Sequence, residues 1–249
     1  MDLNSQFLTT AMDFRSFHNE TDSGLKDDGY GQELPLHHCT LCGKKAWFFM
    51  DRAVIALGCE ICAQDGYPVH TTVDNRLLTC PPDHVRVDGR SLNAQETEQL
   101  FPAVHTLHIP GVGGYFFPSP TELTIRLCEK PEGVFLTCWI DHGVSPQSAG
   151  YAYVVLPCAS AEETVAYAAH PGMEILANTP DLQAVQGSES GLTGYVFRKP
   201  GRLDGISAQT PLILMTHEEK GTLSLSACDP TQLQAQIAFS MEKPLSALQ

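Results

Sequence analysis

The chain has 249 residues, of which 43% are hydrophobic and 18% are charged, a composition typical of a folded protein rather than a disordered one. Its formal net charge of −14 argues against nucleic acid as a partner, because phosphate binding requires clustered Lys and Arg. No apolar run reaches the about 18 residues of a membrane-spanning helix, so no membrane partner is expected either.

Residues 1–35 are polar and rich in turn residues after a short apolar start, which predicts a loop-rich N-terminal segment. The first residues, MDLNSQFLTTAMDF, show no basic region followed by an apolar run, so no secretory signal is visible. From Ala46 onward, apolar and polar residues alternate with a period of two, and turn residues such as Asp65-Gly66 and Asp88-Gly89 separate the runs. This pattern predicts antiparallel strands.

Several runs indicate which side chains are buried, because alternate residues of a strand share one face. Two helices are also predicted. One lies around Glu162 to Ala169, where Ser160 and Glu163 form a capping box, and the other spans Leu92 to Leu100. The predicted strand faces consist of Leu123, Ile125 and Leu127; Leu223, Leu225 and Ala227; and Tyr151, Tyr153 and Val155.

Two longer strings, Trp47–Arg76 and Trp139–Pro157, join short apolar strands with polar residues at fixed places. Their order and spacing resemble the central β-sandwich of the family 8 polysaccharide lyases, which include hyaluronate, chondroitin AC and xanthan lyases. The segments that carry the resemblance are Lys45-Ala46-Trp47-Phe48-Phe49, Val69 to Arg76, Gly113 to Pro118, His142-Gly143, Tyr151-Ala152-Tyr153 and Asp229-Pro230-Thr231-Gln232.

The resemblance implies an all-β fold, a large antiparallel β-supersandwich of the galactose-mutarotase-like kind with one short helix. Residues 36–243 are then expected to form the central sandwich, with residues 1–35 as its truncated start. Residues 244–249 are expected to be a tail that leads to a missing C-terminal β domain.

The resemblance also implies cleavage of a uronic-acid-containing polysaccharide by β-elimination, without a cofactor. The family carries its catalytic Asn, His, Tyr and Arg on a helical toroid domain, and no position here matches those motifs, so no catalytic residue is assigned. The expected partners are an acidic polysaccharide and the helical toroid, or a neighbouring chain carrying it. The expected location is extracellular or periplasmic. The isolated chain is expected to show no lyase activity. The alternative is a non-catalytic carbohydrate-binding or scaffold domain.

His70, Asn75 and Arg76 are the candidate substrate-binding residues. Arginine suits a carboxylate through paired hydrogen bonds, and asparagine suits sugar hydroxyls. The alternative is that Asp74 and Arg76 form a structural polar cluster. Other residues with possible site chemistry are more typical of a turn (His142) or of the core (Trp47, Trp139, Tyr151 and Tyr153).

Nine cysteines are present, and four of them form two C-x-x-C pairs, Cys39/Cys42 and Cys59/Cys62. This spacing suits a zinc ribbon and leaves a zinc-stabilised interaction domain as a second alternative. On a regular strand, however, Cys59 and Cys62 point to opposite faces and cannot share a metal. The sequence therefore favours no metal site, with the cysteines as buried thiols.

Overall fold

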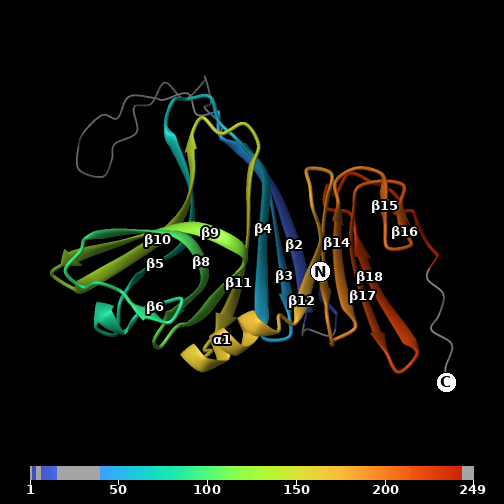
Figure 1. Ribbon diagram of the computed structural model, residues 1–249. Helices are drawn as coiled ribbons and strands as arrows, with labels where there is room; N and C mark the ends of the chain where they lie inside the picture. The colour runs from blue at the N-terminus through green and yellow to red at the C-terminus, as the bar shows by residue number, and fades with distance from the viewer. Residues whose placement is uncertain (1, 4–6, 16–39, 243–249) are drawn as a thin grey trace.

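The computed structural model describes residues 2–3, 7–15 and 40–242, and Figure 1 shows their arrangement. Strands dominate, as the sequence predicts. The first and largest sheet has eleven strands and runs β1-β2-β3-β4-β11-β9-β8-β6-β7, with β10 paired to β9 and β5 paired to β10. Its strands are β1 (Asp2–Leu3), β2 (Phe7–Arg15), β3 (Cys42–Met50), β4 (Ala53–Cys62), β5 (Pro68–Leu77), β6 (Arg86–Val87), β7 (Arg90–Ser91), β8 (Glu98–Ile109), β9 (Gly113–Lys130), β10 (Gly133–Val144) and β11 (Ala149–Pro157). A short 3-10 helix, Pro82–His84, precedes β6.

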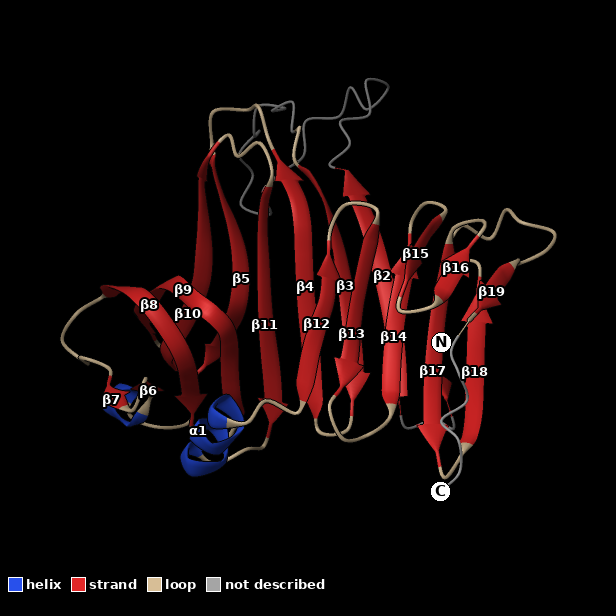
Figure 2. Cartoon of the chain, turned by 45° about the vertical axis from the view of Figure 1, so that its right-hand side comes forward, coloured by secondary structure: helices blue, strands red, loops and turns tan. Residues whose placement is uncertain are grey.

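The remaining strands form two smaller sheets that follow the helix α1 (Ala161–Ala169). In the view of Figure 2, the second sheet lies beside the first, and the third lies at its far side. The five-stranded sheet has the order β12-β13-β14-β17-β18, and the three-stranded sheet has the order β15-β16-β19. Their strands are β12 (Met173–Asn178), β13 (Leu182–Gly187), β14 (Leu192–Phe197), β15 (Gly201–Leu203), β16 (Ile206–Ala208), β17 (Leu212–Glu219), β18 (Thr222–Cys228) and β19 (Phe239–Met241).

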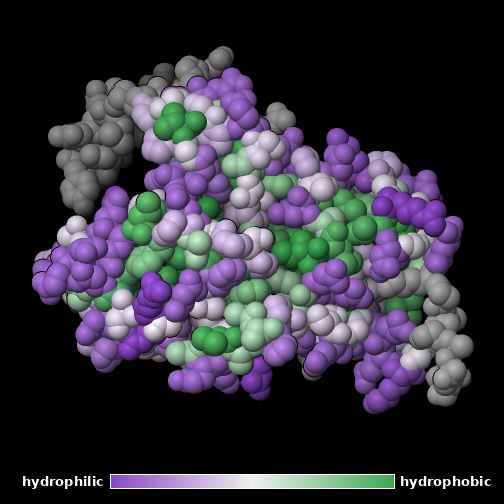
Figure 3. All heavy atoms as spheres, in the orientation of Figure 1, coloured by the Kyte–Doolittle hydropathy of each residue, from purple (hydrophilic) through white to green (hydrophobic). Residues whose placement is uncertain are grey.

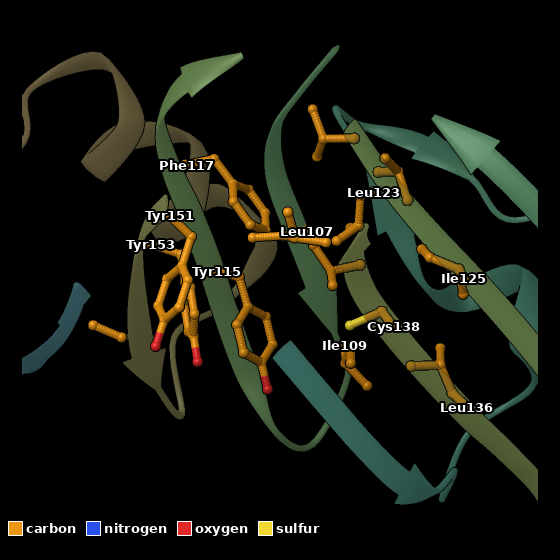
Figure 4. Packing of buried hydrophobic residues seen from close by; sticks show 14 of the residues in the cluster. Leu107, Ile109, Tyr115, Phe117, Leu123, Ile125, Leu136, Cys138, Tyr151 and Tyr153 are labelled. Carbon is orange, nitrogen blue, oxygen red and sulfur yellow. The ribbon is translucent and has the colours of Figure 1, made fainter. Parts of the chain in front are cut away.

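The long strand β9 lets the first sheet curl over its own core. Its beginning pairs with β11 and its end pairs with β10, so the sheet changes direction along one continuous strand. The resulting core contains Phe117, Leu123 and Leu136, all fully buried, and Figure 4 shows these side chains converging. Full burial of such a side chain stabilises the fold by about 1.5–3 kcal/mol. The predicted buried face at Leu123, Ile125 and Leu127 is confirmed.

A second core lies between the first and second sheets. Phe48 and Ile55 from the first sheet pack in it with Val185 and Val196 from the second. Apolar side chains also gather near the middle of the face shown in Figure 3. Because β4 and β11 contribute to both cores, alternate residues of β11 divide between them: Tyr151 and Tyr153 enter the first core, whereas Val154 and Leu156 enter the second.

The helix α1 begins at the predicted capping box. The hydroxyl of Ser160 accepts a hydrogen bond from the backbone of Glu163, whose side chain accepts one from the backbone of Ser160. The helix packs closely against β9 because residue 114 is glycine: a Cβ there would lie 2.0 Å from Oγ1 of the buried Thr164. No described helix is long and apolar enough to cross a membrane.

Two local predictions are wrong. Residues 92–97 form turns and Glu98 begins β8, so the helix expected over Leu92 to Leu100 is absent. From Glu98 onward the side chains alternate between the two faces of a strand, with Gln99 buried and Leu100 exposed. The strand context therefore overrides the helix propensity of these residues. The face of Leu223, Leu225 and Ala227 is largely exposed, because β18 is the edge strand of its sheet. The described part of residues 1–35 holds β1 and β2, and the tail at 244–249 lies outside the described residues.

Candidate functional site

The two strings singled out in the sequence meet in the first sheet, where β5 pairs with β10. The pairing joins His70 to Asp141 and Thr72 to Trp139, then passes directly to Asp74 with Cys138, so Val73 forms a bulge. Beyond a bulge of this kind, the side chains change face. His70, Thr72 and Asn75 therefore lie on one face, which we call the outer face, while Thr71, Asp74 and Arg76 lie on the inner face.

The outer face carries a shallow pocket of about 170 Å³, lined by His70, Thr72, Arg126, Thr137 and Trp139. The imidazole of His70 stacks on the indole of Trp139 with 5.3 Å between ring centroids. The guanidinium of Arg126 lies 5.1 Å from the centroid of the same indole. The two contacts hold the His70 and Arg126 side chains against the indole, the second by the attraction of a cation to a ring face.

Two carboxylates moderate the charge of this pocket. The Glu98 carboxylate lies 2.6 Å from Nη2 of Arg126, and the Asp141 carboxylate lies 3.6 Å from Nε2 of His70. The Arg126 side chain nevertheless remains 58% exposed, so an approaching anion can reach its guanidinium. Asn75 lies beside the pocket, where its side-chain oxygen accepts a hydrogen bond from the hydroxyl of Thr137.

The inner face holds Arg76 in a polar cluster around the buried carboxylate of Asp74. Nε of Arg76 donates hydrogen bonds of 2.8 and 2.7 Å to the two carboxylate oxygens of Asp74, whose side chain is only 4% exposed. The hydroxyl of Tyr115 donates to the same carboxylate. Burial, together with this hydrogen bond, raises the pKa of Tyr115 well above its usual value. The cluster that the sequence offered as the alternative for Asp74 and Arg76 is therefore present, on the face opposite His70 and Asn75.

His142 continues the inner face as the end of an aromatic row. Nε2 of His142 lies 2.7 Å from the hydroxyl oxygen of Thr71, and its ring stacks on Tyr151, which stacks on Tyr153 at 5.7 Å. Figure 4 shows the two tyrosine rings side by side. Burial lowers the pKa of His142 and raises that of Tyr153 to about 12. These groups are neutral near pH 7 and stabilise the sheet rather than binding charge.

Arg126 and Thr137 complete the pocket, yet neither was a candidate from the sequence. The signal was the alternation of β9, which puts Arg126 on the face opposite Leu123, Ile125 and Leu127. Trp139 is buried, as predicted, but it lies outside the described core clusters, under His70 and Arg126.

The cysteine pairs behave differently from the expectation. Glu60, with a φ of 52°, belongs to a bulge at which Cys59 pairs with Lys44 and Cys62 pairs with Cys42. Since paired residues share a face, Cys59 and Cys62 lie on the same face, contrary to the argument from a regular strand. Cys39 lies outside the described residues, among which no group of three or more metal-ligating side chains occurs.

Comparison with known proteins gives matches along most of the chain. The model for "Polysaccharide lyase family 8, super-sandwich domain" matches residues 9–168. The model for "Polysaccharide lyase family 8, C-terminal beta-sandwich domain" matches residues 174–238, whereas the sequence expectation put that domain after residue 243. The two matches meet just after α1, where the chain passes from the first sheet to the second.

Individual relatives agree with these matches. A hyaluronate lyase of Thermasporomyces composti is 31% identical over 237 residues, covering 88% of this chain and 30% of the relative. A xanthan lyase of Bacillus sp. strain GL1 is 31% identical over 230 residues, covering 81% and 25%. The structure of a Paenibacillus xanthan lyase superposes with a TM-score of 0.80 at 24% identity, covering 97% of this chain and 24% of that one, which supports the fold. The chain thus spans about a quarter to a third of these relatives.

Proposed function

Because the chain belongs to polysaccharide lyase family 8, we propose that it forms the β-sandwich part of an enzyme that cleaves an acidic polysaccharide by β-elimination. The observation that carries this proposal is the pair of family matches, which cover residues 9–168 and 174–238 in order. The relatives' printed names, hyaluronate lyase and xanthan lyase, support an acidic polysaccharide as substrate. A helical catalytic domain, in the same protein or a neighbouring one, and an extracellular or periplasmic location complete the proposal.

The outer-face pocket is the part of this chain that we propose contacts the substrate. Arg126 offers a guanidinium to a uronate carboxylate, and a hydrogen bond to a charged group is stronger than one between neutral groups. His70, Thr72 and Thr137 add groups that suit sugar hydroxyls. A volume of about 170 Å³ suits part of one sugar residue, so the pocket contributes one contact point along a longer chain.

These residues bind and orient a substrate rather than catalyse the elimination. In β-elimination a base removes the proton beside the carboxylate, and a nearby cation makes that proton more acidic. Arg126 supplies a cation, but its Glu98 partner and the shallow pocket suit binding and orientation. We therefore assign no catalytic residue among the described residues, and we include His70 and Asn75 as substrate-contacting residues. Arg76, the third residue expected from the sequence, is paired with Asp74 on the opposite face and is left out of the proposed contact.

A second candidate is a carbohydrate-binding domain without catalytic activity. The observation that favours it is that five residues of this chain alone line the pocket, all from the β5, β9 and β10 strands. Such a pocket can bind sugar without a helical partner.

One experiment tests the binding site that both candidates share, and it also tests whether the chain alone forms product. The purified chain is titrated with hyaluronan, chondroitin and xanthan oligosaccharides and with neutral dextran, and the ultraviolet absorbance of unsaturated uronate is followed in parallel. We expect salt-sensitive binding of the acidic sugars only, weakened about tenfold by Arg126→Met. Arg202→Met is the matched control, because Arg202 is equally exposed and also pairs with a glutamate. Unsaturated product formed by the chain alone would show that it contains catalytic groups that we have not assigned. Equal binding of dextran would refute the acidic specificity.

A further inference from the structure

Cys42 and Cys62 face each other at one end of the first sheet. Cys42 is the first residue of β3, Cys62 is the last residue of β4, and the two are direct partners in the antiparallel register. Direct partners in such a ladder have Cα atoms about 4.5–5.5 Å apart, which lies within the range that a disulfide spans. Both thiols are free, and Cys42 lies close enough to raise the pKa of the Cys62 thiol.

The bulge at Glu60 creates this pairing. Without the extra residue, the register that joins Lys44 to Cys59 would set Cys42 opposite Ile61, an apolar residue of the first core. The bulge turns Ile61 to the core and brings Cys62 opposite Cys42. Cys59 stays one pair further along, opposite Lys44, where it is buried and close to Arg198.

We propose that Cys42 and Cys62 form a cross-strand disulfide when the protein meets a disulfide-type oxidant. The Cys62 thiolate attacks oxidised glutathione and displaces one glutathione thiolate. The Cys42 thiolate then attacks the mixed disulfide and displaces the second. Two protein thiols and one glutathione disulfide become one protein disulfide and two glutathione thiols, so electrons and protons balance.

The cross-link would join β3 to β4 beside the loops that lead into the outer-face pocket, and it would remove the S–H with which Cys62 donates to Gln147. The Cys62 thiol contacts the backbone oxygen of Gln147 at 2.7 Å, and the backbone of Ala63 donates to Pro146. The backbone of Gly66 donates to the Ser145 hydroxyl. These contacts join the β4–β5 and β10–β11 loops, which precede His70 and follow Asp141 respectively. This inference is independent of lyase activity.

Peptide mapping tests the cross-link directly. Trypsin cleaves after Lys26, Lys44, Arg52 and Arg76, so one peptide, residues 27–44, carries Cys39 and Cys42, and another, residues 53–76, carries Cys59 and Cys62. The double variant Cys39→Ser/Cys59→Ser leaves one cysteine in each peptide. After incubation with oxidised glutathione and alkylation, we expect the two peptides to be linked in the wild type and in this variant, and separate in Cys42→Ser and in Cys62→Ser.

Thermal unfolding and metal analysis complete the test. Oxidation should raise the Tm of the wild type by about 5 °C and leave a Cys42→Ser/Cys62→Ser variant unchanged, because the cross-link restricts the unfolded chain. Burial and the neighbouring Cys42 and Glu60 raise the pKa of the Cys62 thiol, so the link should form faster at higher pH. Loss of the link in the Cys39→Ser/Cys59→Ser variant would overturn the proposal, as would one zinc ion per purified chain that disappears in Cys42→Ser.

Discussion

The hydroxyl of Tyr115 on β9 donates a hydrogen bond to the carboxylate of Asp74 on β5, in the interior of the first sheet. The same carboxylate pairs with Arg76 and is 4% exposed, whereas the Arg76 side chain is 37% exposed. The buried charge of Asp74 is therefore balanced by Arg76, whose side chain still reaches solvent. A buried carboxylate of this kind is stable only while its partners remain.

Replacing Asp74 should destabilise the protein strongly. Asp74→Ala leaves the Arg76 guanidinium and the Tyr115 hydroxyl without their shared acceptor, and we expect the free energy of unfolding to fall by about 3 kcal/mol in urea denaturation. Glu98→Ala is the control, since its exposed pair with Arg126 contributes less than about 1 kcal/mol. Equal losses in the two variants would contradict the structural role of the buried cluster.

Gly58 should resist substitution because it makes room for a ring. A Cβ at this position would lie 2.1 Å from Cε1 of Tyr151, whose ring is held between His142 and Tyr153. We expect Gly58→Ala to lower the free energy of unfolding by about 1–3 kcal/mol. In Gly172→Ala the new Cβ meets its nearest neighbour, Tyr167, at an ordinary 3.7 Å, so a change within about 0.5 kcal/mol is expected. If Gly58→Ala left the free energy of unfolding unchanged, the tyrosine row would be free to move.

The half-buried His142 should make stability depend on pH. Burial lowers its pKa in the folded protein, so the unfolded chain takes up this proton at a higher pH than the folded one. The stabilisation is therefore present above the ordinary histidine pKa of about 6.5 and is lost as the pH falls below it. We expect Tm to drop between neutral and mildly acidic pH, and His142→Gln to flatten that drop.

The exposed His105 provides the control for this prediction. His105→Gln should keep the wild-type pH dependence of Tm, because this side chain lies outside the aromatic row. Identical curves for the wild type and His142→Gln would mean that burial of His142 does not contribute to the acid sensitivity.

The sequence predicted the strands, the capped helix and the family, because these depend on local periodicity and on motif order. The sequence did not predict the features that depend on how one strand pairs with the next. The bulge at Val73 puts Asn75 on the face of His70 but Arg76 on the opposite face, and no local pattern places Arg126 beside His70. The bulge at Glu60 likewise reverses the expected relation between Cys59 and Cys62. A bulge depends on the partner strand as well as its own, so single-sequence periodicity does not locate it.

The measurement that tests the account most directly is an NMR titration of the tryptophan indole N–H signals with a hyaluronan oligosaccharide. The chain has two tryptophans: Trp139 lies in the outer-face pocket, and Trp47 packs against the first core. Trp47→Phe assigns the two signals. The account predicts a saturable shift of the Trp139 signal, lost in Arg126→Met, while the Trp47 signal stays in place. A Trp139 signal that stays unchanged while the sugar binds would contradict the proposed site.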